Sequence, residues 1–243
     1  MKSSVKIKNK LESKGYAKIN SEEFQYSQLE LNEFIKLKED WGNLPIDDFL
    51  MQIDLSYENK TYRLRRWGRY KIDIRKSQLT QLKHRPFFQS ETYNKGAGGI
   101  ERNFAPIVDK TYENIFLKNL IFFNVSNLPL KLAEISLNWE IYLHQIKVIT
   151  QSDFSGKPAP EGIHQDDVEF FSVHLIERNN YKGGEVQVYN LEKELLHEIS
   201  LDSVMDSYYI SDKKVMHGVR EITPISNEMP GERSVLIISY KSV

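Results

Sequence analysis

The chain has 243 residues, of which 40% are hydrophobic and 12% aromatic, enough to bury one large core or two small ones. Lys and Arg total 33 against 34 for Asp and Glu, and this near-neutral balance argues against nucleic acid as the main partner. The lack of cysteine excludes disulfides, zinc–thiolate sites and cysteine nucleophiles.

The N-terminal part of the chain predicts helices. In "SEEFQYSQLELNEFIKLKEDWG", Ser21 is a candidate N-cap, apolar residues recur near helical spacing from Phe24, and a Gly and a Pro close the segment. From Thr61 to Ile74 apolar and polar residues alternate, which indicates one or two strands. The basic run "YRLRRWGRYK" within it suits a strand with one solvated face. Helical spacing returns in "TYENIFLKNLIFF" and "PLKLAEISL".

After residue 138 the sequence predicts β structure throughout. Short runs of β-branched and aromatic residues alternate with turns rich in Gly, Pro, Asn and Ser, and "RNNYKGGE" predicts a tight hairpin. Such spacing is typical of a sandwich or barrel. We therefore predict an α+β fold, a double-stranded β-helix (a cupin-like jelly roll) with N-terminal and flanking helices. Residues 1–243 are expected to form one domain, in which residues 1–60 are a helical extension and residues 138–243 the jelly-roll core.

The segment "EGIHQDDVEF" carries the first candidate for chemistry. In an extended chain, His164 and Asp166 point to the same face, so both side chains can bind one ion. His217 lies downstream at the end of a short apolar run. Two imidazoles and one carboxylate form a facial triad that leaves three positions open on an octahedral ion, as non-haem Fe(II) requires. The three residues are therefore candidate metal ligands.

The alternative interpretation is that this H-x-D motif binds no metal, and the chain has other histidines that need no metal to explain them. A lone H-x-D motif is more often a solvated turn than a pair of ligands. His174 lies in an apolar run typical of a core histidine, His197 lies in a polar stretch expected to be exposed, and His144 is ambiguous. The motif needs support from elsewhere in the chain.

Arg233 supplies that support. It opens the apolar run "RSVLIISY" directly after a Pro-Gly turn. A buried cation is costly without an anionic partner, and a guanidinium can hold a ligand carboxylate through two hydrogen bonds. The alternative is an arginine that extends to the surface from a strand end. Together with the candidate triad, we favour ligand binding.

The order H-x-D, His, Arg resembles the Fe(II)/2-oxoglutarate-dependent dioxygenases. The longer string "PAPEGIHQDDVEFFSVHLIERNNYKGGEVQVY … HGV … ERSVLIISY" resembles the bacterial 2OG-Fe dioxygenase family of free L-amino-acid hydroxylases, typified by L-isoleucine 4-hydroxylase. The resemblance covers residues 60–243 and is most specific in "PEGIHQD…GGE". It implies that His164, Asp166 and His217 bind Fe(II) and that Arg233 binds the distal carboxylate of 2-oxoglutarate. It also implies O2 as a co-substrate and ascorbate as a stimulant.

The resemblance further implies hydroxylation of an sp3 carbon of a free L-amino acid, with release of succinate and CO2. The family typically has H-R-D-G, whereas this chain has Gln165 and Asp167, which leaves the metal site intact but affects the expected substrate. Asp167 could meet the substrate ammonium if the chain bends after the iron ligand, because adjacent residues of a regular strand face opposite sides. Carboxylate contacts are expected from a Gly-rich lid that carries Gln89, Asn94 and Arg102. The scarcity of further acids favours an aliphatic or modestly polar side chain.

Two other functions share parts of this pattern. A cupin-type iron enzyme without 2-oxoglutarate would use the same ligands but would not require Arg233. A non-catalytic jelly-roll interaction protein would carry the H-x-D motif as a surface turn. The sequence shows no extended basic surface of the kind that a nucleic-acid or histone demethylase would need. It also has no apolar stretch of the length of a signal peptide or a membrane span. We therefore expect a cytoplasmic protein whose partner is a small molecule, neither nucleic acid nor membrane.

Overall fold

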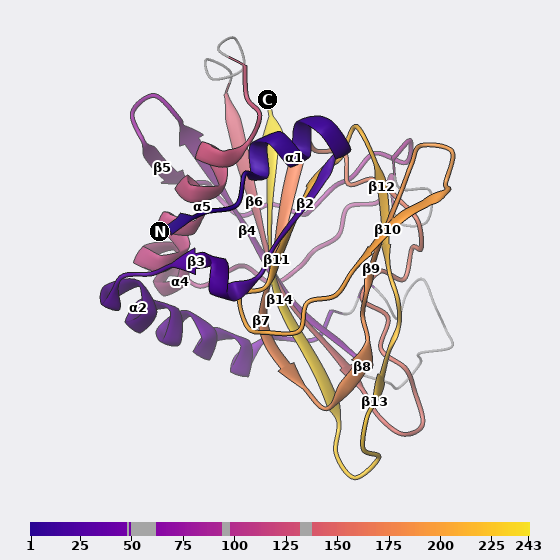
Figure 1. Cartoon of the computed structure of the whole chain (residues 1–243). Helices are drawn as coiled ribbons and strands as arrows, with labels where there is room; N and C mark the ends of the chain where they lie inside the picture. The colour runs from indigo at the N-terminus through magenta and orange to yellow at the C-terminus, as the bar shows by residue number, and fades with distance from the viewer. Residues whose placement is uncertain (48, 50–61, 94–97, 132–137) are drawn as a thin grey trace.

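The computed structural model describes residues 1–47, 49, 62–93, 98–131 and 138–243. Its main feature is a seven-stranded antiparallel sheet in the order β2-β11-β7-β14-β6-β4-β5 (Figure 1). Its strands span Tyr16–Ile19 (β2), Ser207–Ser211 (β11), Phe170–Asn179 (β7), Gly231–Ser242 (β14), Trp139–Thr150 (β6), Arg63–Asp73 (β4) and Gln78–Gln81 (β5).

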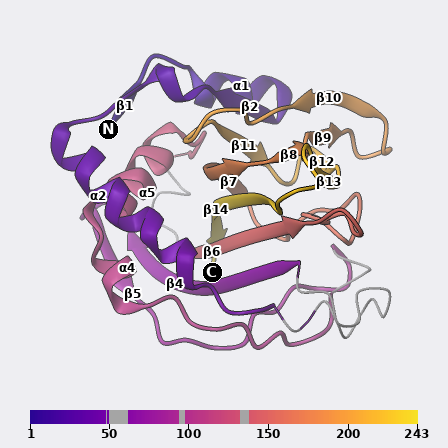
Figure 2. The same cartoon turned by 90° about the horizontal axis from the view of Figure 1, so that it is seen from below.

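A smaller sheet lies on one side of the large one and the helices lie on the other (Figures 1 and 2). Its order is β10-β9-β12, and a separate pair joins β8 to β13. These strands span Tyr181–Gly183 (β8), Val186–Tyr189 (β9), Leu195–Ile199 (β10), Met216–Val219 (β12) and Ile222–Pro224 (β13). The arrangement confirms the predicted α+β fold with a jelly-roll core.

The helices cover the outer face of the large sheet. They are α1 (Ile7–Lys14), α2 (Gln28–Lys38), α4 (Asp109–Glu113) and α5 (Ile115–Asn127), with short 3-10 turns at Ser21–Glu23 and Glu39–Asn43 and a small strand pair between Lys2–Ser3 (β1) and Phe24–Gln25 (β3). Helix α5 is apolar on nearly all sides and contributes buried residues to the core between helices and sheet. Among the described residues, no helix has the length and apolarity to cross a membrane.

Side-chain alternation in the central strands creates two cores. In β14, Leu236 and Ile238 pack beneath the helices, whereas Val235 and Ile237 pack between the two sheets. Arg233 has the same parity as Val235 and therefore faces the space between the sheets. The period-2 pattern of one strand thus decides which residues can take part in a site there.

The structure corrects the prediction for the N-terminal region. Ser21 begins a 3-10 turn, and α2 begins later with Ser27 as its N-cap. The Ser27 hydroxyl accepts from the backbone N–H of Glu30 at 3.2 Å, and the Glu30 carboxylate accepts from the backbone N–H of Ser27 at 2.8 Å, a capping box. The helical prediction also missed β2, a strand defined by its pairing with β11, which lies almost 200 residues away in the chain.

The predicted hairpin at "RNNYKGGE" is also wrong. β7 belongs to the large sheet and β9 to the small one, while β8 between them pairs with β13. The chain changes sheets here through residues with positive φ, including Gly183 at 85°, where a Cβ would lie 2.2 Å from the Glu221 carbonyl oxygen. The strand predicted from Thr61 to Ile74 is confirmed as β4. Most of the helix predicted in "PLKLAEISL" lies outside the described residues.

Candidate metal centre

A cavity between the two sheets brings the predicted triad together. His164 and His217 form an antiparallel β-bridge in which each backbone N–H donates to the other's carbonyl, at 2.9 and 3.0 Å. The bridge sets their imidazole centroids 4.3 Å apart. The Asp166 carboxylate completes the group, 3.5 Å from His164 Nε2 and 3.7 Å from His217 Nε2. Ligand atoms of all three residues lie within 4.8 Å of one another, so the group can hold one metal ion.

Hydrogen bonding orients the first imidazole. His164 Nδ1–H donates to the Gly162 carbonyl at 2.9 Å, which directs Nε2 toward Asp166, where it is available to a metal ion. The His217 ring packs against Phe171, and both histidines are buried. Two neutral imidazoles and one carboxylate, without a thiolate, are the donor set that suits non-haem Fe(II).

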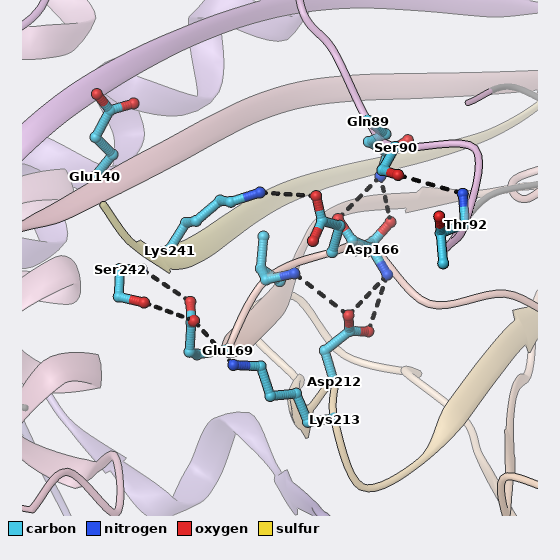
Figure 3. A network of polar contacts seen from close by, with 12 residues as sticks. Gln89, Ser90, Thr92, Glu140, Asp166, Glu169, Asp212, Lys213, Lys241 and Ser242 are labelled. Carbon is cyan, nitrogen blue, oxygen red and sulfur yellow. Dashed lines mark hydrogen bonds and ion pairs between the residues drawn. The ribbon is translucent and has the colours of Figure 1, made fainter. Parts of the chain in front are cut away.

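Asp212 holds the Asp166 loop in place (Figure 3). The backbone N–H of Asp166 donates to both oxygens of the Asp212 carboxylate, at 3.0 and 2.9 Å. Asp212 is almost fully buried, and burial together with the charge of Asp166 raises its pKa to about 7. Asp212 was not singled out from the sequence, because its role depends on a contact with a loop 46 residues away.

Gln89 and Arg102 approach Asp166 from another segment of the chain. Gln89 Nε2 donates to Asp166 Oδ1 at 3.1 Å and to the Asp166 carbonyl at 3.2 Å (Figure 3). Gln89 Oε1 accepts from Arg102 Nη2, and Phe87 and Arg102 are joined by two backbone hydrogen bonds of 2.8 Å. Gln89 and Arg102, two of the four predicted substrate residues, therefore line the cavity, with the Gln89 amide directed at Asp166.

The other two predicted substrate residues have different outcomes. Asp167 adopts a positive φ of 60°, so the chain bends where the sequence required a bend, and its side chain lines the cavity. Its carboxylate is already paired, because Lys241 Nζ donates to Oδ2 at 2.8 Å. Gln165 donates to the Asp212 carbonyl. Asn94 lies outside the described residues.

Arg233 lies in the cavity wall and is only 3% exposed, so it does not extend to the surface. Its Nη2 is buried without a hydrogen-bond partner, and no carboxylate of the described residues lies within the ion-pair distance of 4 Å. A buried guanidinium in this state is costly unless an anion binds to it. The site thus fits a ligand with a carboxylate group.

The cavity is also lined by charged residues that were not singled out from the sequence. Arg63 and Arg65, in the basic run assigned to a solvated face, are instead buried and point into the cavity. Arg63 Nε lies 3.5 Å from Asp47 Oδ2, and Arg65 Nη2 contacts His144 Nδ1 at 2.9 Å. Burial, with the nearby charge of Arg63, lowers the pKa of Arg65 to about 9. Alternation along the strand shows that Arg63 and Arg65 share one face, but it does not show whether that face is exposed to solvent or covered by the rest of the protein.

The remaining histidines follow the expectations. His174 is fully buried and hydrogen-bonded to two serines, and His197 is exposed. His144, which the sequence left open, lines the cavity. Among the described residues, His164, Asp166 and His217 are the group whose ligand atoms lie close enough together to hold a metal ion.

Comparisons with known proteins agree with this site. The family model described as 2OG-Fe dioxygenase matches residues 38–239. A 3(1)-hydroxy-L-isoleucine 4-dioxygenase from Pantoea ananatis is 23% identical, over 95% of this chain and 93% of its own length. Among solved structures, IDO from Bacillus thuringiensis has a TM-score of 0.79 at 21% identity, with 97% of both chains covered. A bsmA homolog from Methylobium petroleophilum has a TM-score of 0.78 at 24% identity, with 96% of this chain and 91% of its own covered.

The two structural neighbours share the fold, and the family match covers most of the chain, including the jelly-roll core and the His-Asp-His group. Fe(II), 2-oxoglutarate and O2 are the cofactor and co-substrates of this family. The chain is a 2-oxoglutarate-dependent dioxygenase and belongs to the 2OG-Fe dioxygenase family.

Proposed function

We propose that this enzyme hydroxylates an sp3 carbon of a free L-amino acid and releases succinate and CO2 from 2-oxoglutarate. The observation that carries the proposal is the placement of a His-Asp-His group and a buried, unpaired arginine in one cavity between the sheets. The name of the Pantoea ananatis relative, a hydroxy-L-isoleucine dioxygenase, supports an amino acid as the substrate class.

In this proposal His164, Asp166 and His217 hold Fe(II). The β-bridge fixes the separation of the two imidazoles, and Asp212 and Gln89 fix the third ligand through its backbone N–H and its carboxylate. When bound, Fe(II) supplies the oxidative chemistry with O2 and 2-oxoglutarate. The protein's task is to place the substrate carbon beside the metal and to keep water away.

Arg233 binds the distal carboxylate of 2-oxoglutarate. Its orphaned Nη2 supplies a donor to an anion, and the apolar side chains of Val235 and Ile237 on the same face of β14 exclude water from the contact. The buried cation also favours this function over a cupin-type enzyme without 2-oxoglutarate, which has no anion to place there. Burial of both histidines argues against the interaction-protein alternative, which required a surface turn.

Arg102 binds the substrate carboxylate. Its side chain is 5% exposed and lies 4.7 Å from the centre of the Phe87 ring, so it is held in place at the cavity wall. The Gly-rich segment that carries it also carries Gln89, so substrate contacts and metal-ligand contacts come from one stretch of chain. This stretch is the predicted lid.

The test is mass spectrometry of free L-amino acids incubated with the enzyme, Fe(II), ascorbate and 2-oxoglutarate. Gain of one oxygen atom by a free amino acid, with stoichiometric succinate, is the expected result. A peptide and a nucleic acid are assayed in parallel. Hydroxylation of only the peptide or the nucleic acid would contradict the substrate class.

A further inference from the structure

The carboxylates around the cavity differ in what neutralises them. Asp166 belongs to the metal group, Asp167 is paired with Lys241 at 2.8 Å, and Asp47 lies near two arginines, at 3.5 and 3.9 Å. Glu161 is the exception. Within the described part of the chain, no Lys or Arg lies within 4 Å of its carboxylate.

Glu161 lies beside the triad but is not part of it. Its Oε1 is 3.5 Å from His164 Nε2, yet its carboxylate is absent from the group whose ligand atoms converge within 4.8 Å. A metal ion on His164 Nε2 requires the neutral imidazole, so the histidine cannot then serve as the counter-charge. The metal-loaded cavity therefore contains a largely buried carboxylate, 16% exposed, without a cationic side chain in contact.

We propose that Glu161 accepts the α-ammonium group of the substrate. This inference rests on the proposed function and extends it to a residue outside the earlier expectations, which assigned the ammonium to Asp167. A desolvated ammonium needs an anion with no competing cation. Lys241 already neutralises Asp167 and would repel a second cation, whereas no Lys or Arg of the described residues lies within 4 Å of the Glu161 carboxylate, and Arg63 and Arg102 act on it only from farther away.

The partner for the other half of the amino-acid head group lines the same cavity. Arg102 and Glu161 both line the cavity and carry opposite charges, and the charge of Glu161 favours the charged form of the Arg102 guanidinium. A free amino acid presents a carboxylate and an ammonium on one carbon, so a cation and an anion in one cavity match it. A 2-hydroxy acid with the same side chain presents only the carboxylate and would leave Glu161 unpaired.

The experiment compares two probes that differ only in the ammonium group: L-isoleucine and 2-hydroxy-3-methylpentanoate. If the amino-acid pool assay selects another amino acid, that compound and its 2-hydroxy acid replace them. Dissociation constants are measured without O2, from the change in the visible band of the Fe(II) and 2-oxoglutarate complex on titration, so that turnover plays no part. The proteins are the wild type, Glu161→Gln and Asp167→Asn, which each remove one negative charge from the same cavity.

We expect the wild type to bind the amino acid at least about tenfold more tightly than the 2-hydroxy acid, because loss of one partner of a buried charged pair is strongly unfavourable. Glu161→Gln should bring the two constants close together, while Asp167→Asn should preserve the preference. Mn(II) affinity, measured by calorimetry, should be unchanged in Glu161→Gln.

Three results would overturn the assignment of Glu161. They are an intact preference in Glu161→Gln, a preference lost only in Asp167→Asn, or a large loss of Mn(II) affinity in Glu161→Gln, which would make it a metal-binding group. Failure of the wild type to bind any free amino acid would instead overturn the proposed function, and the Glu161 assignment with it.

Discussion

Arg233 and Ser234 are neighbours on β14, but their side chains enter two regions that bury polar groups differently. Ser234 faces away from the cavity, and its hydroxyl is one of several buried neutral groups without a partner on that side of the sheet. Arg233 faces the cavity, where several of the unpaired buried atoms belong to guanidinium groups, also on Arg63, Arg65 and Arg102. An unpaired neutral group costs little compared with an unpaired charge.

Two histidines show the same difference. His174, on the helix side, contacts Ser207 at 2.7 Å through Nδ1 and Ser172 at 3.0 Å through Nε2. His217, in the cavity, has no partner for Nδ1 and directs Nε2 toward Asp166. On the helix side, His174 is satisfied by the protein itself. In the cavity, His217 and Arg233 carry atoms that a metal and ligands would satisfy, and the following variants test that contrast.

Loss of a metal ligand should have the largest effect. Replacing His164, Asp166 or His217 with Ala removes an anchoring atom, so turnover should fall below detection and Mn(II) affinity should fall steeply, with the fold preserved. The measurements are succinate release and calorimetric metal titration. His197→Ala, which changes an exposed histidine, should leave both unchanged. A triple-ligand variant that still consumed 2-oxoglutarate would rule the assignment out.

Arg233→Ala should raise the Km for 2-oxoglutarate by about tenfold or more, because truncation of a buried charge-assisted pair costs roughly 2–5 kcal/mol. The Km for the amino acid should change far less. Steady-state kinetics with each substrate varied in turn provide the measurement. Arg220→Ala, which alters an exposed arginine paired with Glu198, is the control. An unchanged Km for 2-oxoglutarate would remove Arg233 from the co-substrate site.

Gln89→Ala should weaken Mn(II) binding by roughly 10- to 100-fold, because groups that orient a metal ligand have effects of this order. The reason is the loss of the 3.1 Å hydrogen bond to Asp166 Oδ1. Calorimetric metal titration decides between two roles for this residue. If Gln89 contacts only the substrate, metal affinity will be unchanged and only the Km for the amino acid will rise.

His174 should give the smallest effect, on stability alone. Burial lowers its pKa from 6.5 to about 3, so below pH 6.5 the unfolded chain takes up a proton that the folded protein refuses. Stability is therefore lost as the pH falls from about 6.5 toward 3, and at pH 5 the loss is about 2 kcal/mol. Urea unfolding of the metal-free protein at pH 7.5 and pH 5 measures it.

His174→Gln is the matched variant for that measurement. It should be less stable than the wild type at pH 7.5, because it loses hydrogen bonds to two buried serines. Its further loss between pH 7.5 and pH 5 should be smaller than that of the wild type by about the 2 kcal/mol assigned to His174. Equal losses in the two proteins would show that His174 does not titrate abnormally.

The parts of the site that could be predicted from the sequence are those with a local signature. His164 and Asp166 follow from the period-2 geometry of a short motif, and the apolar run "RSVLIISY" after a Pro-Gly turn predicted the strand that carries Arg233. The bend at Asp167 was stated as a requirement and is present. In each case the neighbouring residues in the sequence are enough to predict the feature.

The parts that could not be predicted depend on contacts between distant segments. Asp212 supports Asp166 from 46 residues away in the chain, and β2 is defined by its pairing with β11. Arg63 and Arg65 were assigned to a solvated face because alternation distinguishes two faces without saying which one the small sheet covers. Glu161 was part of the quoted motif, but its lack of a cationic partner is visible only in three dimensions.

The central claim is that this cavity binds Fe(II) through the triad and 2-oxoglutarate through Fe(II) and Arg233. The most direct measurement is the visible spectrum of the wild-type protein after anaerobic addition of Fe(II) and 2-oxoglutarate, with His217→Ala as the control. The account predicts a weak charge-transfer band in the wild type that is absent from His217→Ala. Wild-type protein that binds Fe(II) but develops no band on addition of 2-oxoglutarate would contradict it.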